Sequence, residues 1–63
     1  MNNFESTDQL WSVEDVAAYL RVPVKTLYQW KWRGEGPPVS KVGRHLRYDA
    51  ASVRAWVAGL EAA

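Results

Sequence analysis

One amphipathic segment, residues 22–34, constrains the fold of this chain more than any other stretch. Pro23 stands at its start, where a fixed φ suits the first turn of a helix and the missing N–H costs little. Gly34 closes it after the cationic residues Lys31 and Arg33, a pattern typical of a helix C-terminus. The residues between Pro23 and Gly34 are therefore predicted to form a helix.

The predicted helix has two unlike sides when its residues are placed at about 100° intervals. Leu27 and Trp30, with Val24 near them, form an apolar side that is typical of a protein core. The other side and its flanks carry cations, an amide and aromatic rings, namely Lys25, Tyr28, Gln29, Trp32 and Arg33. A solvated helix face usually mixes both charge signs, so a face without any acid favours a polyanionic partner.

Composition limits the chain to one small domain. It has 63 residues and no Cys, so no disulfide or thiolate metal site is expected. The formal net charge of +1 hides a segregation, because residues 25–47 hold six of the eight Lys and Arg residues and one of the seven acids. No signal peptide or membrane-spanning run is present, so we expect a cytoplasmic protein without a membrane partner. We predict a flexible tail over residues 1–9 and one domain over residues 10–63.

Two more helices are predicted, one on each side of the first. Ser12 with Asp15 three residues later forms a capping-box pattern, and four apolar residues between positions 13 and 20 recur at helical spacing. Asp49 is a predicted N-cap, and four apolar residues between positions 53 and 60 recur in the same way. The three apolar faces predict a single core. Its expected members are Val16, Leu20, Leu27, Trp30, Val53, Trp56 and Leu60.

A β-hairpin is predicted between the second and third helices. Two short extended runs, residues 39–42 and 46–48, flank a turn led by Gly43. The basic residues at or near its tip are Lys41, Arg44, His45 and Arg47. Such a hairpin suits a DNA backbone or a minor groove. The alternative is a solvated hairpin whose cations protect an edge strand, and only the preceding helix favours DNA over it.

Residues 21–23 make a tight connection between the first two predicted helices. So short a turn fits a helix-turn-helix, whose second helix reads DNA. An ordinary helical hairpin with a solvated second face fits the spacing about equally well. The acid-free side of the second helix favours DNA.

An ordered pattern runs through residues 10–20, 22–28, 38–48 and 52–57. It resembles the excisionase-type group of MerR-like winged helix-turn-helix domains. The resemblance implies a mainly α fold with a small β-hairpin, in which the second helix enters the major groove and the hairpin, or wing, meets the backbone or minor groove. The DNA contacts it implies are Lys25, Thr26, Tyr28, Gln29 and Arg33 on the helix and Lys41, Arg44, His45 and Arg47 on the wing. Pro23 and the pair Val24-Lys25 depart from the family pattern, so base contacts are not carried over.

No catalytic chemistry is visible in the sequence. One His, no Cys and no nucleophile or paired-carboxylate motif lead us to expect no enzyme activity, no metal and no cofactor. His45 is either a phosphate contact or a turn residue. Trp32 has three possible roles: packing beneath the wing, touching DNA, or meeting a partner protein.

The resemblance implies an excisionase, an accessory factor that binds and bends double-stranded DNA to direct a tyrosine integrase towards excision. A small MerR-like transcriptional regulator would use the same DNA face. A protein-interaction module with a solvated basic face is a third possibility, which the charge segregation disfavours. We expect no dimerising helix after residue 60, which favours the accessory role. Several copies are then expected to associate cooperatively on one DNA site.

Overall fold

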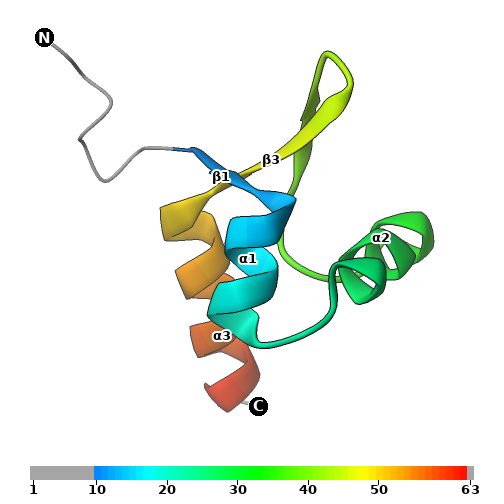
Figure 1. Ribbon diagram of the computed structural model, residues 1–63. Coiled ribbons are helices and arrows are strands. Elements are labelled where there is room, and N and C mark those ends of the chain that lie inside the picture. The colour runs from blue at the N-terminus through cyan, green and yellow to red at the C-terminus, as the bar shows by residue number, and fades with distance from the viewer. Residues whose placement is uncertain (1–9, 63) are drawn as a thin grey trace, which may run out of the picture.

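The computed structural model describes residues 10–62, so the tail predicted for residues 1–9 lies outside the described part. Within it the elements are β1 (Leu10–Ser12), α1 (Val13–Leu20), α2 (Val24–Arg33), β2 (Ser40–Val42), β3 (His45–Asp49) and α3 (Ala50–Ala62). Figure 1 shows the β2–β3 hairpin rising away from α1 and α3, with α2 set to one side. The predicted fold class, a mainly helical winged helix-turn-helix, is confirmed. No helix of residues 10–62 is long and apolar enough to cross a membrane.

The N-terminus of α1 has the predicted capping interactions, and its C-terminus has an unusual backbone conformation. The Asp15 N–H donates to Ser12 Oγ and the Ser12 N–H donates to Asp15 Oδ2, both at 3.0 Å, which confirms the capping box. Arg21 ends the helix in the left-handed conformation, at φ 61°. The N–H groups of Arg21 and Val22 both donate to the Ala17 carbonyl. This tight turn directs the chain from α1 into α2.

Both predicted boundaries of α2 are confirmed. Pro23 is the N-cap residue, and Gly34 is the left-handed C-cap at φ 72°. The following loop folds back against the helix, so that Gly36 lies close to the Trp30 side chain. A Cβ added at Gly36 would stand only 2.9 Å from that side chain. Gly36 also has φ 84°, so glycine suits this position for two reasons.

The sheet has three antiparallel strands in the order β1-β3-β2. β1 was not predicted, since it is only three residues long and exists through pairing with a strand far along the chain. Side chains alternate along β3, so Leu46 and Tyr48 are buried on one face while His45 and Arg47 occupy the other. The wing, residues 40–49, therefore has one face towards the core and one towards solvent.

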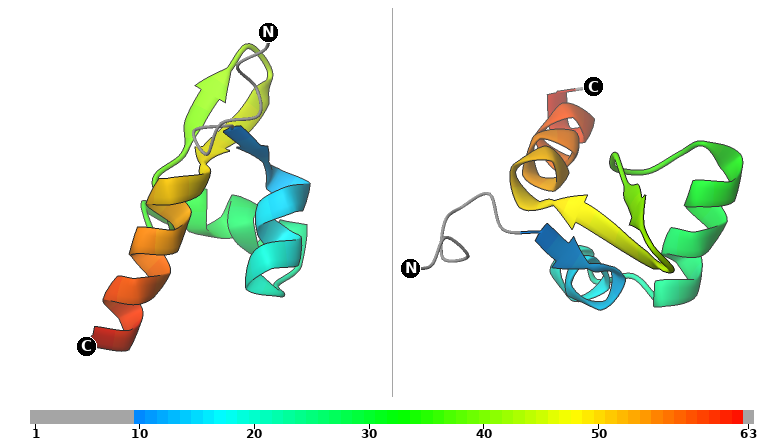
Figure 2. Two further views of the ribbon diagram at one scale, coloured as in Figure 1. Left: turned by 90° about the vertical axis from the view of Figure 1, so that its left-hand side faces the viewer. Right: turned by 90° about the horizontal axis from the view of Figure 1, so that it is seen from above.

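The core is drawn from all three helices and from the wing. Its buried members are Val13, Val16, Ala17, Leu27, Leu46, Tyr48 and Val53. Leu20 and Trp30 pack at its edge as partly buried residues, and Trp56 lies against Trp30 with ring centroids 5.7 Å apart. Placing Leu60 in the core was wrong, because its side chain is 57% exposed. Figure 2 gives the reason: the last turns of α3 run past the rest of the molecule.

Burial of Tyr48 makes the stability of the domain sensitive to alkaline pH. Its pKa is raised first by desolvation and then by the neighbouring Tyr28 hydroxyl. Tyr48 therefore loses its proton at about pH 10 in the unfolded chain and only at a higher pH in the folded domain. The contribution of the neutral Tyr48 side chain to the free energy of unfolding is fully present below pH ~10 and is lost as the pH rises through the folded-state pKa. We expect Tyr48→Phe to keep more of its neutral-pH stability at pH 11 than the parent chain does. Denaturant unfolding from pH 8 to 11 checks this, with Tyr19→Phe, at a residue that is 47% exposed, as the control.

Candidate nucleic-acid interface

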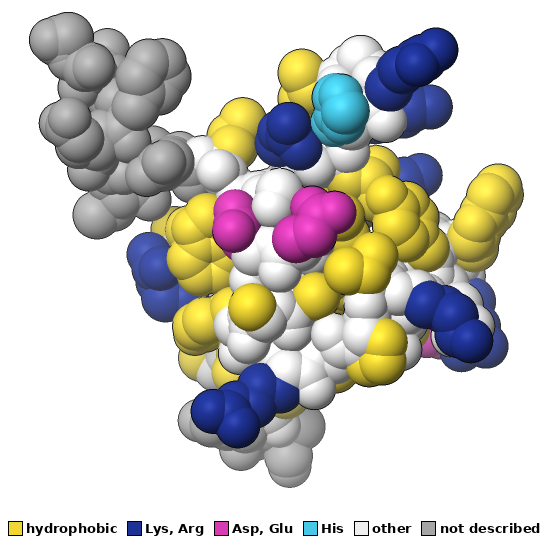
Figure 3. All heavy atoms as spheres, viewed as in Figure 1, with side chains coloured by type: hydrophobic (Ala, Val, Ile, Leu, Met, Phe, Trp, Pro, Cys, Tyr) yellow, Lys and Arg dark blue, Asp and Glu magenta, His cyan; other side chains and the backbone are white. Residues whose placement is uncertain are grey.

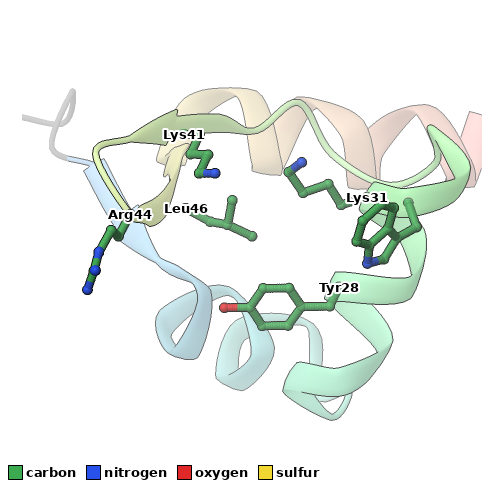
Figure 4. Close-up of a pocket in the computed structure, with 6 residues that line it drawn as sticks. Tyr28, Lys31, Lys41, Arg44 and Leu46 are labelled. Atoms are coloured by element: carbon green, nitrogen blue, oxygen red, sulfur yellow. The ribbon is translucent and has the colours of Figure 1, made fainter.

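A hollow of about 260 Å³ lies between α2 and the wing. We call it the helix–wing hollow. Its lining residues are Tyr28, Lys31 and Trp32 from α2, and Lys41, Arg44 and Leu46 from the wing. Figure 4 shows the Tyr28 ring extending from α2 and the Leu46 side chain entering from the opposite wall. Among the residues that the structure describes, three cations and no acid line this space, and the cations come from both walls.

The register of the wing decides which of its cations reach the hollow. Lys41 pairs with Leu46 across the two strands, and directly opposed residues project from the same face of a sheet. Lys41 therefore shares the face of the buried Leu46, and Arg44 joins it from the turn at the tip. Arg47 and His45 occupy the opposite face, where Arg47 Nη1 donates to the Leu46 carbonyl at 2.9 Å. The structure thus brings two of the four predicted wing residues together with α2 and places the other two on the reverse face.

The outer side of α2 carries the remaining predicted residues. Lys25 and Gln29 are exposed, stand four positions apart, and do not line the hollow. They project away from the buried Leu27, as the helical spacing predicts. Thr26 is half-buried in the first turn, and Arg33 is exposed at the last. Lys25, Gln29 and Arg33 are therefore presented outward on α2, outside the hollow.

The cations of the hollow are electrostatically available. Among the side chains of residues 10–60 the one ion pair within 4.0 Å joins Arg33 Nη1 to Glu35 Oε1, and both side chains are more than half exposed, so it stabilises little. Lys31, Lys41 and Arg44 have no carboxylate partner at that distance within the described part of the chain. In Figure 3 the acidic side chains seen most clearly lie over α1, with one dark-blue side chain directly above them and the other dark-blue side chains of the wing farther away. Because the described residues pair no acid with the cations of the hollow, their positive charge is left for an external polyanion.

Lys31 and Leu46 line the hollow although the sequence prediction left them out. At 100° spacing Lys31 falls between Leu27 and Val24, on the apolar side of α2, so only the position of the wing shows that its charge lines a hollow. Trp32 is 87% exposed, which excludes packing beneath the wing from the three roles left open for it. Contact with DNA and contact with a partner protein remain.

A family model described as a helix-turn-helix domain matches residues 12–60, which spans α1, α2, the wing and most of α3. The chain belongs to this helix-turn-helix family. A helix-turn-helix domain binds DNA sequence-specifically through its second helix, which is α2 in this chain. No curated protein shows significant similarity to the chain.

We expect Gln29 and Lys25 to be the base-reading side chains of this helix-turn-helix domain, since both are exposed on the outer side of α2. Glutamine can pair with adenine N6 and N7, and lysine can donate to guanine O6 and N7, in the major groove. We expect Gln29→Ala to cost about 1–3 kcal/mol on the preferred site, to relax the preference at one base pair, and to change binding to random DNA little. Binding to the preferred and to a scrambled duplex at one salt concentration tests this. Equal losses on both duplexes would remove Gln29 as a reader.

Proposed function

We propose that this helix-turn-helix domain is an excisionase, which binds and bends DNA so that a tyrosine integrase acts towards excision. The observation that carries the DNA-binding part is the helix–wing hollow, which has cations on both walls and no acid among its described lining residues. The accessory role itself is supported by the four ordered segments that resemble excisionase-type domains. In this proposal the protein works in the cytoplasm by binding alone, without catalysing a step.

Cooperative binding of several copies belongs to the same proposal. One small DNA-binding module buries only ~600–1,000 Å² on DNA, which limits the affinity of a single copy. Neighbouring copies on adjacent sites would add affinity and would also impose a bend along the DNA. A gel-shift titration on the native site is expected to show stepwise or cooperative complexes, with mobilities that depend on where the site lies in the fragment.

The decisive experiment measures excision directly. A plasmid substrate flanked by attachment sites is incubated with the tyrosine integrase encoded nearest to this chain, with and without the protein. We expect the protein to raise the excision yield and not the integration yield. A single 1:1 complex on unbent DNA, together with an unchanged excision yield, would contradict the excisionase role.

A small transcriptional regulator is the second candidate. The match to a helix-turn-helix domain family supports a regulator as well as an excisionase, because both use the same DNA face. A regulator would occupy a promoter and change transcription in the absence of any integrase. A reporter assay on the promoter nearest the preferred site separates the two functions.

A further inference from the structure

Trp32 is unlike the other tryptophans of this chain. Trp11 and Trp30 pack against the core, and Trp56 lies on the Trp30 ring. Trp32 is 87% exposed in the last turn of α2. One exposed apolar residue is ordinary on a protein surface. The residues around Trp32 indicate a role for it.

Trp32 borders a space that is lined by both positive charge and apolar surface. Lys31 and Lys41 approach from facing walls, Tyr28 stands one helical turn before Trp32, and Leu46 is 7% exposed at the wing side. A free inorganic phosphate would use the cations but leave both rings without a contact. A purely apolar partner would leave the cations desolvated and unpaired, which is costly. The lining therefore fits a ligand that carries both anionic and apolar groups.

A nucleic-acid strand has this combination, with a phosphate between successive sugars. DNA binding by the domain also fixes where such a strand must run. If the outer side of α2 enters a major groove and the wing tip meets the neighbouring minor groove, the backbone between those grooves passes across the space that separates helix and wing. That space is the helix–wing hollow.

We propose that the helix–wing hollow seats one sugar-phosphate strand of the duplex, and that Trp32 packs against its deoxyribose rings. Lys31, Lys41 and Arg44 contact the phosphates on either side. The Tyr28 hydroxyl, which is a donor as well as an acceptor, is placed to join them. Binding of the strand in the hollow is independent of base sequence, and it fixes how α2 and the wing are positioned on the DNA. This inference rests on DNA binding by the domain and not on the excisionase role.

Salt dependence separates the apolar contact from the ionic ones. A lysine that neutralises a phosphate releases counterions, so its loss lowers the slope of log K against log salt by about 0.9 for each contact. A ring against a sugar releases none. Replacing Trp32 is therefore expected to shift the whole salt plot downward without changing its slope, whereas replacing Lys31 is expected to flatten it.

The experiment measures binding of four variants to a random-sequence duplex and to a selected site at several salt concentrations. We expect Trp32→Ala to bind both duplexes about tenfold more weakly with an unchanged slope, and Trp32→Phe to lose about threefold or less. Lys31→Ala is expected to lower the slope by about one unit. Leu60→Ala, at an exposed apolar residue on α3, is the control and is expected to match the parent chain. In the complex, nuclear Overhauser contacts are expected between the Trp32 indole and deoxyribose protons.

Several results would contradict the proposed binding of a strand in the hollow. Unchanged binding by Trp32→Ala would assign the ring to a partner protein, and a loss confined to the selected site would make it a base reader. A parent chain that binds neither duplex would contradict the proposal outright. If strand binding in the hollow is confirmed but the excision yield does not respond to the protein, the excisionase role is contradicted and this inference is not.

Discussion

Replacing Trp30 with alanine is expected to cost about 3 kcal/mol of the free energy of unfolding. Large-to-small changes of this kind cost roughly 3–5 kcal/mol at buried sites, and the lower end applies because the ring is only partly buried. The change removes the Trp56 contact at 5.7 Å and the surface on which the loop at Gly36 closes. A domain of this size has roughly 3–9 kcal/mol of stability in total. The variant is therefore expected to lose a third or more of it.

Trp32→Ala is a matched control for this prediction. It makes the same chemical change two positions along the same helix, at a side chain that is 87% exposed. Exposed substitutions usually change stability by less than about 0.5 kcal/mol. Urea unfolding followed by helical circular dichroism compares the two variants without relying on tryptophan fluorescence. Similar midpoints for both would mean that Trp30 is not part of the packed core.

The double change Lys41→Ala and Arg44→Ala is expected to weaken binding to every duplex by about 100-fold at low salt. Both cations line the hollow on the face of the wing that meets α2. Contacts to charged groups are worth about 1.5–3 kcal/mol each, and each 1.4 kcal/mol is tenfold in affinity. The salt slope is expected to fall by about two units, because two phosphate contacts are lost. Binding isotherms from 50 to 300 mM salt on a random-sequence duplex measure both quantities.

Arg47→Ala provides the comparison within the same hairpin. Arg47 carries the same charge but lies on the opposite face of β3, bonded to the Leu46 carbonyl at 2.9 Å. We expect it to change affinity by less than about threefold and to leave the salt slope within half a unit of the parent value. A loss as large as that of the double variant would mean that DNA contacts the other face of the wing.

Local signals in the sequence were sufficient for the helices of this protein. Caps and breakers act over three or four residues, so the Ser12–Asp15 capping box and the Pro23 and Gly34 boundaries of α2 were predicted and are confirmed. Helical spacing also separated the buried Leu27 from the exposed Gln29. These features depend on neighbours along the chain, which a sequence displays directly.

Strand pairing and the members of the core depended on contacts between distant segments. β1 is a strand only because it pairs with β3, and that register also buries Tyr48, which the sequence prediction did not place in the core. Leu60 has the correct helical spacing but lies beyond the surface on which α3 packs, a fact that periodicity alone does not encode.

The composition of the interface was predicted in outline, and its geometry was decided by the fold. A charge count along the chain identified the basic segment from residue 25 to residue 47. It did not show that Lys31 faces Lys41 across a hollow, or that Arg47 lies on the face of the wing that is turned away from the hollow. Both facts follow from the pairing of β2 with β3 and from how the hairpin stands beside α2. The sequence by itself determined which charges and rings this protein carries, and only the tertiary structure decided which of them lie together, because two segments can face each other only when both are fixed in space.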